Sequence, residues 1–351
     1  YYPDGSIFHR ARTTTSFTMN GSAEEYFGGV HSFRHRYRYR EIPQTPEDTT
    51  WGDWNDWSDW GGSEFEMANL PVGEYHFQAQ CRDWAAFESL VTDYFMTIVE
   101  ANFEEKTLLI VDETKDGNGR PGSPNDEQCD RFYREILGLD TTTWTTPDGW
   151  TVSEIDYRNH KIGDASYVSP KDVCNQRVII WHSDDKSELR LSDNTRILQE
   201  YLDRGGRLIV SGWDVLSPFA DGDEVTFTSG FAYRYLRIAA AKRENDKLFV
   251  GMTGDAELGY PDLELDREKV PGRWNGLDKC WLLEPRHRTD SIGGWRGFEG
   301  RPPDFEGRGC AVRNFAPVNP WRTIVLGFPL YFMGTDQAVQ FIRTAIADID
   351  G

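Results

Sequence analysis

Residues 105–351 constrain the fold most, because continuous apolar runs of strand length alternate there with segments of helical spacing. Runs of this kind, typical of strands buried on both faces of a parallel sheet, occur at 107–112, 177–182, 207–212 and 323–328. Apolar residues at helical spacing occupy 126–137, 192–203 and 336–349. This alternation predicts a doubly wound α/β domain with a mostly parallel sheet. The stretch 220–322 lacks the pattern and is expected to be an irregular insertion with one helical piece over 231–242.

The first 104 residues follow a different pattern, with short alternating runs separated by Pro, Gly, Asp and Asn. In the run 32–39, alternation places the arginines on one face of a strand and four other side chains on the opposite face: Phe33, His35, Tyr37 and Tyr39. Further strands are expected at 75–81 and 95–99. Because no helical pattern separates these strands, we expect an all-β sandwich at 1–104 followed by the α/β domain at 105–351.

Two segments of the chain resemble known families. The pattern YRYRE followed by LPVGEYHFQAQCRD, within about residues 30–100, resembles the fibronectin type III-like modules of bacterial surface proteins. The motifs LLIVDETKDG, VIIWHSDD, LQEYLDRGGRLIVSGWD and TIVLGFPLYFM resemble the class I glutamine-amidotransferase-like domains of secreted bacterial proteins. The resemblance implies a fibronectin-like sandwich joined to a flavodoxin-like α/β domain.

The turn that should carry the amidotransferase nucleophile departs from that family. Active members place a cysteine on a sharp strand-to-helix turn, and the matching turn here is Val210-Ser211-Gly212-Trp213-Asp214, with Trp213 at the nucleophile position. No histidine follows the final strand, and the only later one is His287 in the insertion. The sequence therefore favours a degenerate domain without amidotransferase activity.

A hydrolytic triad is the alternative source of chemistry at the ends of the strands. His182, Ser211 and Asp214 supply the residue types that a triad needs. His182 and Ser211 would approach each other only across adjacent strands, so a polar network at the strand ends is the competing interpretation.

The loop that follows the first buried strand has the composition of a calcium loop. Asp112, Asp116, Asn118 and Asp126 bring the hard oxygen ligands that calcium prefers. The spacing departs from the EF-hand pattern. A turn that leads into a helix capped by Asp126 is the other interpretation.

Four tryptophans recur at every third position in the run 51–60: Trp51, Trp54, Trp57 and Trp60. In a helix or in an extended form with three residues per turn, the tryptophans align in one stripe and the intervening aspartates in another, whereas a strand would scatter them over both faces. An exposed stripe would stack on sugar rings, as in a carbohydrate-binding module, whereas a buried stripe would cover a thin core.

Charge and cysteine content limit the partners. The chain has 38 Lys and Arg against 58 Asp and Glu, a net charge of −20, which disfavours nucleic acid and anionic membranes. No apolar run approaches the roughly 20 residues that span a bilayer. The five cysteines include Cys280 and Cys310, which flank a Gly- and Arg-rich stretch and are candidates for a disulfide.

These features favour a non-enzymatic extracellular or cell-surface component with a structural or adhesive role. Its expected partners are other surface proteins, copies of itself or glycans. The chain begins at Tyr1 without a methionine, which is typical of a segment of a larger secreted polypeptide. A hydrolase of peptides, esters or glycans and a carbohydrate-binding module remain the alternatives.

Overall fold

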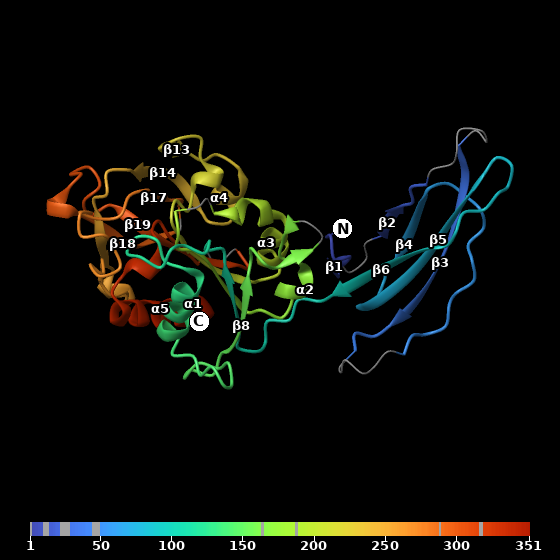
Figure 1. Cartoon of the computed structure of the whole chain (residues 1–351), viewed down its shortest axis with the longest axis horizontal. Helices are drawn as coiled ribbons and strands as arrows, with labels where there is room; N and C mark the ends of the chain where they lie inside the picture. The colour runs from blue at the N-terminus through green and yellow to red at the C-terminus, as the bar shows by residue number, and fades with distance from the viewer. Residues whose placement is uncertain are drawn as a thin grey trace. The chain divides into compact units, whose positions relative to one another are not determined.

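The protein is a mixed α/β chain that forms two compact units (Figure 1). The computed structural model describes residues 2–9, 14–21, 29–43, 50–162, 165–186, 189–287, 289–315 and 319–351. The N-terminal unit comprises 1–101 together with 169–174, which includes the short helix α2 (Pro170–Val173), and the C-terminal unit comprises 102–168 and 175–351. In the described part of the chain, no helix combines the length and the apolar character needed to cross a membrane.

The N-terminal unit is a sandwich of a four-stranded and a two-stranded sheet. The larger sheet has the order β1-β6-β5-β3, with bounds Ser6–Phe8, Thr92–Val99, Gly73–Asp83 and Val30–Arg40. The smaller sheet pairs β2 (Thr14–Thr18) with β4 (Glu64–Ala68). Strands β3, β5 and β6 are antiparallel, and β1 pairs with β6 only at its last three residues.

The predicted alternation in β3 is confirmed. Tyr37 and Tyr39 pack against the buried core of the sandwich, and His35 stacks on Phe65 of β4 with ring centroids 3.7 Å apart. The arginines of β3 contact tryptophans instead. The alternation therefore separates an apolar inner face from a cationic outer face.

A nine-stranded sheet organises the C-terminal unit, with the order β16-β15-β18-β19-β20-β12-β11-β7-β8. Five of these strands are parallel: β20 (Arg322–Leu326), β12 (Arg207–Gly212), β11 (Val178–Ser183), β7 (Thr107–Asp112) and β8 (Thr151–Asp156). The longer helices are α1 (Asp126–Ile136), α3 (Thr195–Leu202) and α5 (Thr335–Asp350). The continuous apolar runs of the sequence thus form most of the parallel core, as predicted.

The region 220–322 is not the irregular insertion that the sequence suggested. The antiparallel strands β19 (Gly309–Asn314), β18 (Asp290–Gly297), β15 (Phe249–Gly254) and β16 (Leu263–Glu264) extend the main sheet. A second sheet contains β13 (Glu224–Thr226), β14 (Ile238–Glu244) and β17 (Cys280–Pro285). The strands β9 (Lys161–Ile162) and β10 (Ala165–Ser166) form a further small pair.

The helical piece expected over 231–242 is also wrong. Helix α4 (Gly230–Arg234) is short, and the chain continues into β14. Arg237 lies between them with a φ of 62°, in the left-handed region that ends a helix. Cys280 and Cys310, the candidates for a disulfide, are both free thiols in this structure.

Helix α1 begins at Asp126 as predicted but has a different capping residue, and α3 begins later than predicted. Helix α1 is capped by Asn125 and not by Asp126. The Asn125 side chain accepts from the Gln128 backbone amide, and the Gln128 side chain accepts from the Asn125 backbone amide. This reciprocal capping box was readable as N-x-x-Q in the sequence. Helical spacing predicted a helix over 192–203, but α3 begins at Thr195 after a 3₁₀ turn, and its N-cap is Asn194.

Candidate functional site

His182 is the centre of a buried polar cluster at the carboxyl end of β11. Its Nδ1 lies 2.9 Å from Asp184 Oδ2 and 3.5 Å from Asp112 Oδ1, and the Tyr133 ring stacks on the imidazole at 3.7 Å. Burial by itself would lower the pKa of His182, but the Asp112 and Asp184 carboxylates raise this pKa to about 9. The cluster is therefore a buried, charge-compensated network.

The structure does not bring the predicted triad together. Nε2 of His182 has no hydrogen-bond partner among the described residues. Ser211 Oγ instead donates to the Phe328 carbonyl at 3.2 Å and accepts from the Leu330 amide at 2.9 Å. A nucleophile needs a hydrogen-bonded base, so this serine is bound as a structural group.

Asp214 belongs to a different cluster. Its carboxylate accepts from Arg243 at 2.7 Å and from the Trp281 indole N–H at 3.0 Å. Lys279 lies 3.6 Å away. These cationic partners hold Asp214 in an ion-pair cluster and not in a relay with His182.

The position expected for an amidotransferase nucleophile is filled by apolar packing. Trp213 is fully buried and packs edge-on against Phe332, with ring centroids 4.8 Å apart, and against Trp274 at 6.3 Å. His182 and Ser211 are buried as well. No substrate reaches these side chains in this conformation.

Three carboxylates meet beside this cluster, which we call the acidic trio: Asp112, Asp126 and Asp130. One oxygen of each lies within 4.8 Å of the others. Asp112 ends β7, while Asp126 and Asp130 are four residues apart on α1 and therefore share one helix face. Burial, followed by the Asp112 carboxylate, raises the pKa of Asp126 to about 6.

The acidic trio contains only half of the predicted calcium ligands. Asp116 Oδ1 accepts from the Asp126 amide at 3.4 Å, and Asn118 Oδ1 accepts from the Arg120 amide at 3.0 Å, so both side chains stabilise the loop. Asp130 was missed, although its i+4 spacing from Asp126 was a readable signal. A cavity of about 510 Å³ opens beside the trio, lined by Thr114, Lys115, Asp116, Asn125, Asp126, Glu127, Asp156, Arg158 and Asn159.

In the N-terminal unit, the tryptophans interleave with the arginines of β3. We call this set the Arg–Trp ladder: Arg34, Arg36, Arg38 and Arg40 with Trp51, Trp54, Trp57 and Trp60. Each guanidinium carbon lies 4.5–5.0 Å from the indole centroids that it contacts. Arg36, for example, lies 4.7 Å from both Trp54 and Trp57.

A three-residue repeat aligns the tryptophan segment with the strand. After each tryptophan, one amide donates to a β3 carbonyl at 2.8–3.1 Å, and these donors are Gly52, Asn55, Ser58 and Gly61. The acceptors are the carbonyls of every second residue of β3. Three residues of the tryptophan segment therefore cover the same length as two residues of the strand. Two strand residues span about 6.8 Å, so the segment rises by about 2.3 Å per residue. The aspartates at the third positions are exposed and the tryptophans half-buried, as the two-stripe prediction required.

The ladder also occupies the surfaces that a sugar would need. Each indole has two guanidinium neighbours, and at the end of the ladder Arg82 lies 4.5 Å from the centroid of Trp60. Sugar rings stack on free aromatic faces. The four tryptophans predicted as ligand-binding residues are therefore engaged within the unit.

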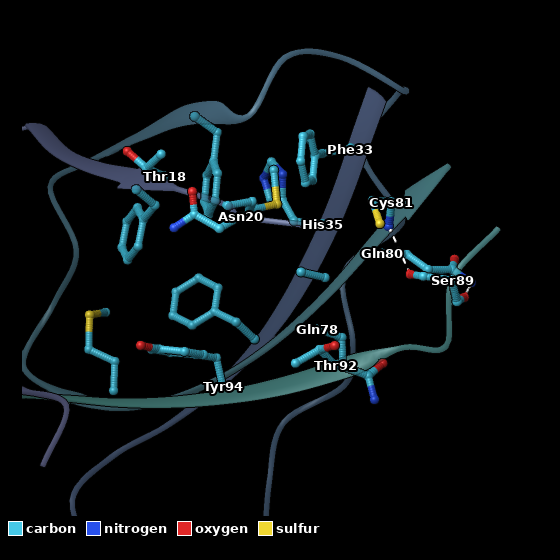
Figure 2. Close-up of a pocket in the computed structure, with 16 residues that line it drawn as sticks. Thr18, Asn20, Phe33, His35, Gln78, Gln80, Cys81, Ser89, Thr92 and Tyr94 are labelled. Carbon is cyan, nitrogen blue, oxygen red and sulfur yellow. Dashed lines mark hydrogen bonds between the residues drawn. The ribbon is translucent and has the colours of Figure 1, made fainter. Parts of the chain in front are cut away.

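A second cavity, of about 320 Å³, lies in the N-terminal unit between the sheets. Figure 2 shows Phe33 and His35 from β3 and Tyr94 from β6 around it, with Cys81 and Ser89 at one side. The segment 84–95 exposes a set of large apolar side chains, which we call the apolar ridge: Trp84, Phe87, Leu90, Val91, Tyr94 and Phe95. Tyr94 lines the cavity, whereas Phe95 lies on the opposite face of β6 and stacks on His76. Sequence reasoning missed this feature, although WAAFESLV stood between two predicted strands.

Comparisons with known proteins give little guidance. No protein family and no curated protein matches this chain. Among solved structures, the soluble domain of PmoD from Methylocystis sp. aligns at 14% identity and a TM-score of 0.18, over 28% of this chain and 86% of that one. A putative polysaccharide deacetylase from Bacillus anthracis aligns at 13% identity and 0.16, and a polysaccharide deacetylase from Bacillus cereus at 11% and 0.15. The alignments to the deacetylases cover 58% of this chain and 60% of each deacetylase. At such TM-scores the likenesses carry no argument.

Proposed function

We propose that this protein is a non-enzymatic extracellular or cell-surface component, with a structural or adhesive role, that binds another polypeptide through the apolar ridge. One observation carries the proposal. Of the seven large apolar side chains that are exposed in the described part of the chain, six lie in the ridge, between 40% and 90% exposed. Exposed apolar side chains concentrated in one short segment of a chain mark an interaction site.

The ridge belongs to an ordered part of the chain. Asp83 Oδ1 accepts from the amides of Ala85 and Phe87, at 2.8 and 2.9 Å, and Ser89 donates its amide to Cys81 O at 2.8 Å. Ala86 takes a φ of 66°, which a residue other than glycine rarely adopts. The loop therefore presents its apolar side chains in a fixed arrangement, which lowers the entropy cost of binding.

The edge of β6 indicates how a partner would bind. Among the described residues, β1 pairs with β6 only over Thr97–Val99. The Thr97 amide donates to Gly5 O, so this side of Thr97 faces the edge of the sheet. Alternate residues of a strand direct their backbone groups to the same edge, and Asp93 therefore faces that edge too, at a position beyond the end of β1. An extended segment of a partner would add a strand along this edge, with an apolar side chain beside Tyr94 at the mouth of the cavity.

The two alternatives lack support from their sites. A hydrolase would need His182 bonded to a nucleophile in an open cleft, and a carbohydrate-binding module would need free indole faces in the Arg–Trp ladder. The proposal agrees with the resemblance of the sequence to fibronectin type III-like modules and degenerate amidotransferase-like domains of surface proteins.

A peptide selection tests the proposal. Random 12-residue peptides displayed on phage are selected on the full chain, and binding is then measured for the variants Leu90→Asp and Ile42→Asp. Ile42 is the exposed apolar residue outside the ridge, so it is the matched control. We expect selected peptides with alternating apolar residues that lose at least tenfold in affinity for Leu90→Asp and keep their affinity for Ile42→Asp.

Two results would contradict this function. Equal binding to both variants would remove the ridge from the interaction. Hydrolysis of ester, peptide or glycan substrates by the wild-type chain that disappears in His182→Ala would show an enzyme. Sedimentation of the unliganded chain distinguishes a second copy from a different partner.

A further inference from the structure

We propose that the acidic trio of Asp112, Asp126 and Asp130 binds a calcium ion at the carboxyl end of β7. One oxygen of each side chain lies within 4.8 Å of the others. Two oxygens on opposite sides of a calcium ion are about 4.8 Å apart, since each Ca–O distance is about 2.4 Å. The spacing is therefore compatible with a shared cation, and calcium suits an irregular set of ligands because it accepts flexible coordination, whereas magnesium demands a near-ideal octahedron.

An unsatisfied oxygen of Asp112 points independently to a ligand. The Asp112 side chain is almost completely buried, and its Oδ1 accepts from the Thr114 amide at 2.6 Å. Oδ2 is buried and has no hydrogen-bond partner among the described residues. An unpaired carboxylate oxygen in the interior is costly, and a cation coordinated to Oδ2 removes that cost.

The surroundings leave the trio with a surplus of negative charge. His182 faces Asp112 at 3.5 Å, and Arg134 binds Asp130 Oδ2 at 3.2 Å. Glu154 binds the same arginine at 2.7 Å and also contacts the Asp130 carboxyl group. The carboxylates of Asp116 and Asp156 act on Asp126. Lys115 and Arg158 lie in the wall of the neighbouring cavity, and even with them the cations are fewer than the carboxylates.

The neighbouring cavity supplies the rest of the coordination shell. Asp126 lies in the wall of the cavity of about 510 Å³, beside Asp116 and Asp156. Calcium takes six to eight oxygens, so three monodentate carboxylates require further ligands. Water entering through this cavity completes the shell, and the site stays open to exchange with solvent.

Thermal unfolding of the full chain, with calcium or with EDTA, tests the site. Calcium at about 100 times its Kd should raise the Tm of the wild-type C-terminal unit by about 5–10 °C. Asp126→Asn should abolish this rise. In EDTA the same variant should be at least as stable as the wild type, because it relieves repulsion within the trio. Asp221→Asn changes an exposed aspartate and should respond to calcium as the wild type does.

The sign of the effect in EDTA separates binding from a structural role. A carboxylate that only stabilises the fold would lower the Tm in EDTA when it is replaced, and that result would overturn the proposal. Luminescence of bound terbium gives a second readout, with signal expected for the wild type and Asp221→Asn but not for Asp126→Asn. No calcium response in the wild type, or a response to magnesium alone, would also refute the site. Peptide binding at the apolar ridge is measured separately, so the two proposals fail independently.

Discussion

Removal of Arg36 should open the Arg–Trp ladder at its centre. The guanidinium contacts Trp54 and Trp57, each at 4.7 Å, and Nε donates to Gln78 Oε1 at 2.8 Å. A cation–π contact at a partly exposed site contributes about 0.5–1 kcal/mol and a hydrogen bond about 0.5–1.5 kcal/mol. The hydrogen bond joins β3 to β5, so only the two cation–π contacts hold the tryptophan segment, and Arg36→Ala should destabilise this segment by about 1–2 kcal/mol.

Hydrogen exchange gives a local measurement of this loss. The amides of Gly52, Asn55 and Ser58 donate to β3 carbonyls, so they report on whether the segment stays bound to the strand. Since 1.4 kcal/mol corresponds to a tenfold change, we expect these amides to exchange about 5–30 times faster in Arg36→Ala.

Asp56→Ala is the matched control, because this exposed residue lies in the same segment and outside the stack. Its exchange should stay within a factor of about two of the wild type, as for other surface substitutions. If Arg36→Ala and Asp56→Ala exchanged at the same rate, the interleaved stacking would contribute nothing to holding the segment, and the reasoning above would be refuted.

Three further predictions concern burial. Burial lowers the pKa of His35. The stability that this residue contributes is therefore complete above about pH 6.5 and is lost as the pH falls through the lowered pKa. Hydrogen exchange of the β3 amides, corrected for the intrinsic rate, should rise from pH 7 to pH 5 in the wild type and should rise less in His35→Phe. Trp213→Ala should cost about 3–5 kcal/mol in urea unfolding of the C-terminal unit, and a loss below about 1 kcal/mol would contradict its role as a filler of the site. Native alkylation should label Cys81 first, because the other four thiols are buried, and fast labelling of Cys280 would disagree with the structure.

The sequence revealed features that depend on local pattern and missed those that depend on pairing. Alternation in β3 and the three-residue repeat of the tryptophans were both readable, because each is a property of one segment. Their interleaving was not, since it requires knowing that 51–61 runs along β3. The parallel strands stood out as apolar runs, whereas β18 contains Gly293 and Gly294 and resembles a loop until β15 and β19 pair with it.

The candidate site shows the same limit. Asp112 and Asp126 were identified from a loop of calcium-like composition, while Asp130 joins them through the turn of α1. His182 and Ser211 do lie on adjacent strands in register, as a triad would need. The hydrogen bonds of Ser211 to backbone groups near Phe328 come from a distant segment, and no local pattern could indicate them.

The tryptophan segment has a consequence for how the N-terminal sheet can grow. Besides accepting from four amides of the tryptophan segment, β3 donates three of its own amides to that segment. The Phe33 amide donates to Gly61 O, the His35 amide to Ser58 Oγ and the Tyr37 amide to Asn55 Oδ1. Among the described residues, the segment thus terminates the sheet at β3 and leaves the side of β1 and β6 as the edge that can accept another strand. When a sheet has one edge available for pairing, two chains that pair through this edge leave no further edge, so they form a dimer and not an open-ended fibre. Strand addition at this edge would therefore give the chain a single partner and would not polymerise it through this sheet.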